Sequence, residues 1–265
     1  MSRTRQGFTV GPGMDLADSL RWAEDTGFAF VELLLDGPFA RERIAARDDT
    51  AAIAEAVADS PLGLVCHLPF ALDIGSPFEP VREGGVAELL ACLDLASEIG
   101  AEKAVFHPSS RAWNLGWSDE ELAPLILDSV REVTAAARER GVEPCVENVI
   151  DGPYSINGFE DLLSATDAAM TFDTGHARLA GFSATESAAF LDRHHERVSH
   201  VHLSDNRGAS DEPLPVGLGT IDFETVLAPF LDGEWSGTMT HEVGTTNRAY
   251  IETSKRELDG LIRSY

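Results

Sequence analysis

Short apolar runs alternate with helix-like segments along the whole chain. The apolar runs have the length and the β-branched or aromatic content of buried strands, and they lie near residues 7–11, 28–34, 62–68, 103–107, 142–148, 169–173, 197–203 and 236–242. Between them, Ala, Leu, Glu and Arg recur at helical spacing near residues 15–26, 41–58, 79–99, 118–140, 159–166, 184–195, 222–232 and 246–264. The pattern predicts eight consecutive strand–helix units.

Several predicted helices have recognisable start and stop residues. Ser118, Ser183 and Asn157 each precede a glutamate by three residues, which is the spacing of a capping box. Other helices are predicted to end at glycines, which readily adopt the left-handed conformation of a helix C-cap; these are Gly27, Gly100 and Gly141.

The unbroken alternation favours one closed barrel. No linker, low-complexity tract or change of composition divides the 265 residues. A doubly wound sheet would need fewer strands and a glycine-rich phosphate-binding turn after the first one, and GPGMD at residues 11–15 matches that turn poorly. We therefore predict an α/β fold with a single (β/α)8 TIM barrel domain over residues 1–265.

The composition excludes a membrane protein and a disulfide scaffold. The hydrophobic fraction is 43%, and no apolar run approaches the roughly 20 residues of a membrane span. Because the start, MSRTRQGFTV, lacks the apolar stretch of a signal peptide, we expect a cytoplasmic protein. Cys66, Cys92 and Cys145 lie in apolar segments without the spacing of a metal finger, so we expect them to be reduced core thiols.

The charge balance is strongly acidic. The chain has 45 acidic and 20 basic residues, a net charge of −25, and its only two lysines are Lys103 and Lys255. Such a surface repels itself at low salt and resembles the acidic, lysine-poor proteins of extreme halophiles. Binding to nucleic acid normally depends on clustered lysines and arginines. The charge therefore disfavours nucleic acid as a partner.

Residues that can bind metal stand at the ends of the last six predicted strands. In chain order they are His67, His107, Glu147, Asp173, His202 and Glu242. The ends of parallel strands in a closed barrel meet at one mouth, where such barrels place their chemistry. Carboxylates and imidazoles gathered there without lysines would repel one another unless they bound a cation. The set therefore predicts a divalent metal site.

Strand alternation is consistent with this site. If Glu147 points into the barrel, Cys145 does so too, and Val146 faces the helices. If Asp173 points inward, Phe172 faces outward.

Four further histidines are not expected to be metal ligands. His200 precedes His202 by two residues, so it should point inward one layer deeper, as a structural residue or an outer partner of the metal ligands. His241 should face the helices, and His194 and His195 lie in a predicted helix.

Five segments resemble a known family. VENV (146–149), FDTGH (172–176), HVHLSDNRG (200–208), GLGTIDF (217–223) and HEV (241–243) are similar, in this order, to the xylose-isomerase-like TIM-barrel superfamily. That group includes sugar isomerases and epimerases, hydroxypyruvate isomerase, inositol-catabolism enzymes and the endonuclease IV class, also called AP endonuclease family 2. The resemblance implies a metal-dependent isomerase or epimerase of carbohydrate metabolism, with a small sugar, sugar acid or polyol derivative as its substrate.

The resemblance also implies roles for particular residues. Glu147, Asp173, His202 and Glu242 would hold one divalent cation. Three carboxylates and one imidazole suit Mn²⁺, Mg²⁺ or Co²⁺, and Zn²⁺ becomes suitable if the nearby histidines join. Glu147 and Glu242 would be the catalytic acid/base pair that moves a proton through an enediolate. Residues implied to bind the substrate are His67, His107, His176 and Arg207.

Some features of the loops have two interpretations. Trp113 and Trp117 could cover a sugar face or merely pack on a neighbouring helix. The GLGTIDF segment could bring backbone N–H groups near a phosphate at the helix that begins around Asp222, or it could simply turn the chain. The sequence leaves open whether the substrate is phosphorylated and whether the barrel pairs as a homodimer.

Two alternatives to the sugar enzyme remain. Endonuclease IV enzymes use three zinc ions, and most of their ligands have counterparts here. The resemblance places the remaining Asp-x-His motif of that class at Asp211, Glu212 and Pro213, and proline offers a metal no side-chain ligand. This difference and the acidic charge favour the sugar enzyme over an abasic-site DNA repair endonuclease. The second alternative is a barrel that binds metal and ligand without turnover.

Overall fold

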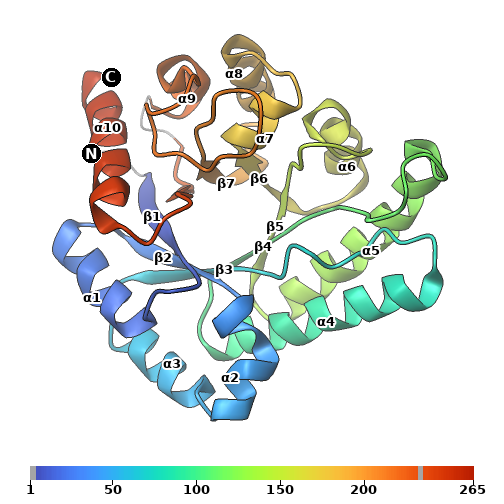
Figure 1. Cartoon of the computed structure of the whole chain (residues 1–265), viewed down its shortest axis with the longest axis horizontal. Helices are drawn as coiled ribbons and strands as arrows, with labels where there is room; N and C mark the ends of the chain where they lie inside the picture. The colour runs from blue at the N-terminus through green and yellow to red at the C-terminus, as the bar shows by residue number, and fades with distance from the viewer. Residues whose placement is uncertain (1–3, 232–234) are drawn as a thin grey trace.

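The strands form a closed parallel barrel that is surrounded by helices (Figure 1). The computed structural model describes residues 4–231 and 235–265. Strands pair in sequence order from β1 to β8, and β8 pairs back with β1 to close the ring. The predicted (β/α)8 fold is confirmed.

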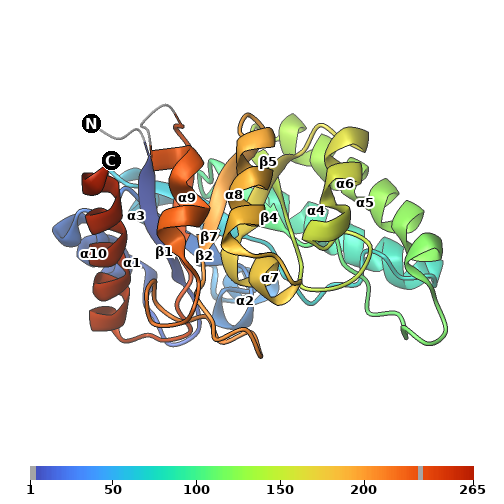
Figure 2. The ribbon, with the colours of Figure 1, turned by 90° about the horizontal axis from the view of Figure 1, so that it is seen from above.

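Each strand overlaps a predicted apolar run. Their bounds are β1 (Arg5–Val10), β2 (Phe30–Leu34), β3 (Gly63–His67), β4 (Lys103–Phe106), β5 (Glu143–Glu147), β6 (Ala169–Asp173), β7 (Val198–Leu203) and β8 (Thr238–His241). The strands run in the same direction, so all of their carboxyl ends lie at one end of the barrel, which faces downward in Figure 2.

Most helices also fall where they were predicted. They are α1 (Leu16–Thr26), α4 (Glu79–Glu98), α5 (Asp119–Glu139), α6 (Phe159–Ala165), α8 (Ala184–Arg193), α9 (Phe223–Leu231) and α10 (Arg248–Ser264). The predicted end of α9 at residue 232 lies outside the described residues. Among the described residues, no helix combines the length and the apolar character needed to cross a lipid bilayer.

The prediction of one continuous helix over residues 41–58 was wrong. The segment forms α2 (Arg41–Arg47) and α3 (Thr50–Ala58), and Asp48 between them has a left-handed backbone with φ 57°. Aspartate tolerates this conformation better than most residues, and the turn ends the first helix. Three short elements were not predicted from the sequence, namely η1 (Gly37–Phe39), η2 (Ile156–Gly158) and α7 (Thr174–Leu179).

Two of the three predicted capping boxes are present. Ser118 begins α5 and Ser183 begins α8, each with reciprocal bonds to the glutamate three residues later. The third was wrong, because η2 occupies residues 156–158 and Asn157 instead donates to the Ala180 carbonyl. The predicted terminal glycines all have positive φ, between 73° and 83°; they are Gly27, Gly100 and Gly141.

An apolar layer fills the interior of the barrel. Phe30, Val65, Val105 and Cys145 form this separate cluster, and the outward-facing side chains of the strands join the larger core beneath the helices. A Cβ at Gly7 on β1 would overlap the Phe30 ring, so this position accepts only glycine while the ring stays in place. Strand alternation is therefore as predicted, with Cys145 inside.

All three cysteines are free and buried, as predicted. Burial raises the pKa of Cys92 and of Cys145 to about 12. Because only the thiolate is reactive, these thiols are poor nucleophiles at neutral pH.

Truncation of the Phe30 side chain should destabilise the whole barrel. Phe30→Ala removes a fully buried aromatic side chain, and we expect it to lower the free energy of unfolding by about 3–5 kcal/mol. Urea unfolding followed by circular dichroism measures this change. Phe78→Ala, at a side chain that is 63% exposed, is the control and should leave the stability nearly unchanged. Equal effects of the two substitutions would contradict the central role of Phe30.

Candidate metal centre

Four strand ends bring the predicted metal ligands together. Glu147 ends β5, Asp173 ends β6, His202 lies near the end of β7, and Glu242 follows β8 directly. One ligand atom from each of these side chains lies within 4.8 Å of the others. Ligands that bind one ion at about 2.1 Å are separated by at most about 4.2 Å. A small adjustment of the side chains would therefore let them share a cation.

Glu147 links this group to a second one. Its Oε2 atom lies 3.3 Å from His67 Nε2 and 3.1 Å from His107 Nε2, and its Oε1 atom lies 3.3 Å from His202 Nδ1. His67, His107 and Glu147 also form a group whose ligand atoms lie within 4.8 Å of one another. The mouth could therefore hold one ion between the carboxylates or a further ion beside the two histidines.

The segment VENV fixes the ends of two neighbouring strands relative to each other. The Asn148 side chain accepts a hydrogen bond from the Asp173 backbone N–H at 2.8 Å and donates to the Asp173 carbonyl at 3.1 Å. These two hydrogen bonds join β5 and β6 beyond the end of β5, in place of the hydrogen bonds of the sheet. It places Glu147 and Asp173 side by side at the mouth.

The segment FDTGH turns β6 into α7. Asp173 Oδ1 accepts the backbone N–H of His176 and so caps the short helix. The turn brings the His176 ring back over the mouth, where its Nδ1 atom lies 3.2 Å from Glu147 Oε1. The second carboxylate oxygen of Asp173 is left for the metal site.

The GLGTIDF segment binds an anion that belongs to the protein itself. The fully buried Asp205 carboxylate accepts the backbone N–H groups of Gly217, Gly219 and Ile221 at 3.1, 2.7 and 3.1 Å. Asp222 in turn accepts the Thr225 backbone N–H and hydroxyl. The donors that could have met a phosphate are thus occupied, and the segment serves to turn the chain.

The electrostatics of the four ligands suit a cation. Burial raises the pKa of Asp173 to about 8, and the charges of Glu147 and Glu242 add to this effect while His176 opposes it. Burial alone would also raise the pKa of Glu147. The charges of His202 and His107 outweigh this effect and hold the pKa well below its usual range. A bound cation would relieve the repulsion that destabilises the Asp173 carboxylate.

Two buried atoms in the site have no hydrogen-bond partner. They are Asp173 Oδ2 and His202 Nδ1, which lie 3.8 Å from each other. His202 Nδ1 is also 3.3 Å from Glu242 Oε2. Unpaired buried polar atoms are costly, and a divalent ion would satisfy both at once. The donor set therefore fits a metal.

The predicted substrate-binding residues divide into two groups. His67, His107 and His176 all lie beside Glu147 at the mouth. Arg207 is exposed on the loop after β7, where its guanidinium pairs with Glu212 at 2.9 Å rather than with a residue of the cluster. Trp113 lies on the surface with 70% of its area exposed.

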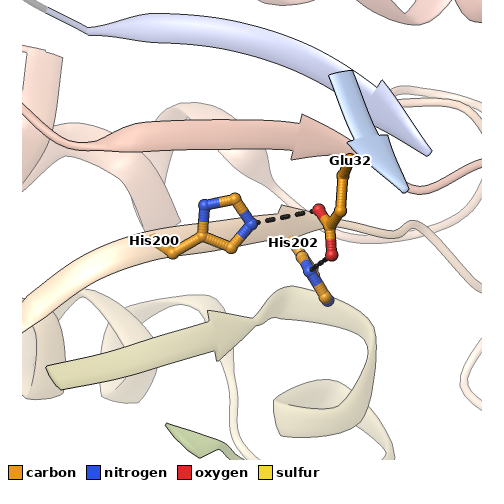
Figure 3. Close-up of side chains that lie close together, drawn as sticks. All are labelled: Glu32, His200 and His202. Atoms are coloured by element: carbon orange, nitrogen blue, oxygen red, sulfur yellow. Dashed lines mark hydrogen bonds and ion pairs between the residues drawn. The ribbon is translucent and has the colours of Figure 1, made fainter. Parts of the chain in front are cut away.

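Glu32 is a buried acid that the sequence analysis missed. It lies on β2, and its carboxylate meets the Nε2 atoms of His200 and His202 at 3.2 and 3.0 Å (Figure 3). The available signal was a lone acid within the apolar run FAFVELLL at residues 28–35. His200 points inward below His202, as expected, and His241 faces the helices, where it contacts Ser254 of α10.

Comparison with known proteins identifies relatives of several activities. The family described as xylose isomerase-like TIM barrel matches residues 20–263. An uncharacterized protein of Methanocaldococcus jannaschii is 29% identical over 68% of this chain and 64% of its own length. The inosose dehydratase of Serratia proteamaculans is 28% identical over 58% of this chain, and the match spans 48% of that enzyme. The "Probable endonuclease 4" of Aquifex aeolicus is 24% identical over 94% of this chain and 91% of its own.

Solved structures show the same fold. A D-tagatose 3-epimerase-like protein superposes with a TM-score of 0.81 at 23% identity, over 98% of this chain and 97% of its own. A Thermus thermophilus protein soaked with ZnCl2 has a TM-score of 0.72 at 26% identity, over 96% of this chain and 97% of its own.

Removal of Glu242 should weaken metal binding and leave the barrel folded. Its side chain is 34% exposed, so Glu242→Ala opens no core cavity. We expect the affinity for Co²⁺ to fall by more than the roughly 10–100-fold that loss of an outer partner of a ligand causes, as measured by competition with a chelator. Glu212→Ala is the control, because Glu212 lies on a mouth loop but pairs with Arg207. An unchanged affinity in Glu242→Ala would remove Glu242 from the ligand set.

Proposed function

Because the chain belongs to the xylose isomerase-like TIM-barrel family, we propose that it is a divalent-metal-dependent isomerase or epimerase of a small sugar or polyol derivative. The observation that supports this function most directly is the convergence of three carboxylates and one imidazole at the barrel mouth. We further propose that residues 1–265 act as one domain, since the pairing of β1 with β8 joins the two ends of the chain.

The residues proposed to hold the ion are Glu147, Asp173, His202 and Glu242. This oxygen-rich set suits Mn²⁺, Mg²⁺ or Co²⁺, and the adjacent His67 and His107 would also suit Zn²⁺. When bound, the ion would polarise the substrate carbonyl and stabilise the negative charge that develops on its oxygen.

Glu147 and Glu242 are proposed to move the proton. They come from β5 and from the residue after β8, and each has a carboxylate oxygen 3.3 Å from His202 Nδ1. One carboxylate would remove the proton from the carbon next to the carbonyl, which leaves an enediolate. The other would return a proton to the opposite face of that carbon in an epimerase, and transfer to the neighbouring carbon would give an isomerase.

A pocket beside Glu242 supports an uncharged substrate. It has a volume of about 490 Å³, and its lining is apolar or hydroxyl-bearing apart from Glu242. The lining residues are Thr9, Gly11, Pro12, Met14, Leu34, Pro213, Glu242, Val243, Gly244, Thr245 and Thr246. A phosphate or carboxylate would require arginine, lysine or free N–H groups. The part of the substrate that enters this pocket is therefore proposed to be neutral.

An abasic-site endonuclease is the second candidate function. It is favoured by the group of His67, His107 and Glu147 beside the main cluster and by the nearly full-length match to the Aquifex aeolicus protein. Against it, Pro213 stands where the resemblance to that class places a zinc ligand, and its side chain cannot bind a third zinc ion. Asp211 does lie close to the site, since its Oδ2 atom is 3.7 Å from His176 Nε2. The net charge of −25 also opposes binding to DNA.

Proton exchange with solvent provides the test of the isomerase or epimerase function. The metal-loaded protein should incorporate deuterium from D2O into at least one member of a panel of unphosphorylated ketoses and inososes. Glu147→Gln should reduce the rate by about 100–10,000-fold, the usual contribution of a general acid or base. Glu102→Gln is the control, because Glu102 lies away from the mouth and forms an ion pair with Arg5 at 2.6 Å.

Metal content must be measured in both variants, so that loss of the ion is distinguished from loss of the base. If the wild type exchanged no member of the panel, a barrel that binds metal and ligand without turnover would become the better hypothesis.

The nuclease alternative has its own test. We expect no metal-dependent incision of a duplex that contains one abasic site, assayed with Mn²⁺, Co²⁺ or Zn²⁺ at low and high salt. Incision of this duplex, without cleavage of the matched intact duplex, would show that the sugar-enzyme proposal is wrong. A known endonuclease IV serves as the positive control at each salt concentration.

A further inference from the structure

Three buried side chains below the barrel mouth are joined through one carboxylate (Figure 3). Glu32 Oε1 lies 3.0 Å from His202 Nε2, and Glu32 Oε2 lies 3.2 Å from His200 Nε2. An ionised carboxylate can only accept hydrogen bonds, so both rings must present N–H at Nε2. In His202 this orientation leaves Nδ1, the atom without a hydrogen-bond partner, directed at the other three metal ligands.

Packing alone gives no reason for this arrangement. Glu32 is fully buried, and its hydrogen-bonded partners among the described residues are the two imidazoles rather than arginine or lysine. Burial of a carboxylate is costly, and well-packed apolar side chains often replace a buried ion pair without loss of stability. A buried acid in the middle of an apolar strand therefore points to a role other than packing.

A further hydrogen bond holds the His200 ring at its other nitrogen. His200 Nδ1 lies 2.6 Å from the Thr238 hydroxyl, and His200 and Thr238 are register partners in the pairing of β7 with β8. With Nε2 protonated toward Glu32, His200 Nδ1 accepts the hydroxyl hydrogen. The Thr238 hydroxyl, His200, Glu32 and His202 thus form a chain of hydrogen bonds that spans the barrel interior and ends at the metal centre.

We propose that Glu32 is a positioning residue that holds the His202 ring with Nδ1 toward the metal ion and strengthens that nitrogen as a ligand. A carboxylate behind a metal-binding imidazole fixes the tautomer and orientation of the ring and raises its basicity. This role rests on the proposed metal centre, but it does not depend on which sugar is the substrate or on whether the barrel catalyses a reaction.

Glu32→Gln provides the main test, because it keeps the shape of the side chain and removes its charge. The glutamine carbonyl can accept from only one of the two rings, and its amide NH2 meets the other. The Co²⁺ affinity of the purified, metal-free protein is measured by competition with a chelator, and the visible absorption of bound Co²⁺ reports the ligand geometry. We expect Glu32→Gln to bind Co²⁺ roughly 10–100-fold more weakly, with altered absorption bands.

Two further variants complete the test. Thr238→Val removes the hydroxyl that orients His200, and we expect a smaller loss of Co²⁺ affinity in the same direction. Ser254→Ala is the control, since Ser254 is also buried and bonds His241, but on the helix-facing side of β8. Its Co²⁺ affinity and absorption bands should match those of the wild type.

Urea unfolding of the metal-free proteins separates positioning from a general structural effect. If Glu32→Gln lowered only the stability, while the folded protein kept the wild-type affinity and absorption bands, the positioning role would be overturned. The number of Co²⁺ ions bound per chain decides whether Glu32 is itself a ligand. If Glu32→Gln lost one of several ions and bound the rest with unchanged affinity, Glu32 would be a ligand of the lost ion, and the positioning role would also be overturned. Failure of the wild type to bind Co²⁺ would overturn the proposed metal centre together with this role.

Discussion

The burial of several carboxylates among imidazoles, at and just below the barrel mouth, is the constraint on which the rest of this structure depends. Glu32, Glu147 and Asp173 are almost completely buried, and the groups around them are imidazoles rather than lysines or arginines. Imidazoles can share protons with carboxylates, but they leave Asp173 Oδ2 and His202 Nδ1 without partners. A folded chain tolerates such a cluster when a cation completes it.

The five segments that resemble the family mostly build the support for this cluster. Asn148 joins the ends of β5 and β6, Asp173 caps α7, and Asp205 fixes the loop after β7 by accepting three backbone N–H groups. Each bond holds a loop or strand end that carries a ligand or lies next to one. Only a few residues of these segments can touch an ion or a substrate. The others keep the ligands within reach of one another.

Periodicity predicted the barrel well because each strand and helix is set by local pattern. It failed where one residue changed the backbone, as at Asp48, or where a turn was too short for a pattern, as in α7. The candidate ligands could be selected from the sequence because each stands at a strand end. Glu32 escaped because it lies in mid-strand, and its partner His200 is 168 residues away in the sequence. Arg207 lies on a loop, and its pairing with Glu212 there has no periodic signal in the sequence.

The same mouth could in principle serve proton transfer or phosphodiester cleavage, because both use carboxylates and imidazoles around divalent ions. The surroundings of the mouth bear on the choice between the two proposals. A nuclease must hold a polyanion, whereas the pocket beside Glu242 offers apolar and hydroxyl groups without a basic side chain. Pro213 lines that pocket, and its carbonyl accepts the Gly244 backbone N–H at 2.8 Å. Pro213, which stands where the resemblance to the nuclease class would place a zinc ligand, thus lines a pocket without a basic side chain, and this lining supports the proposed small uncharged substrate.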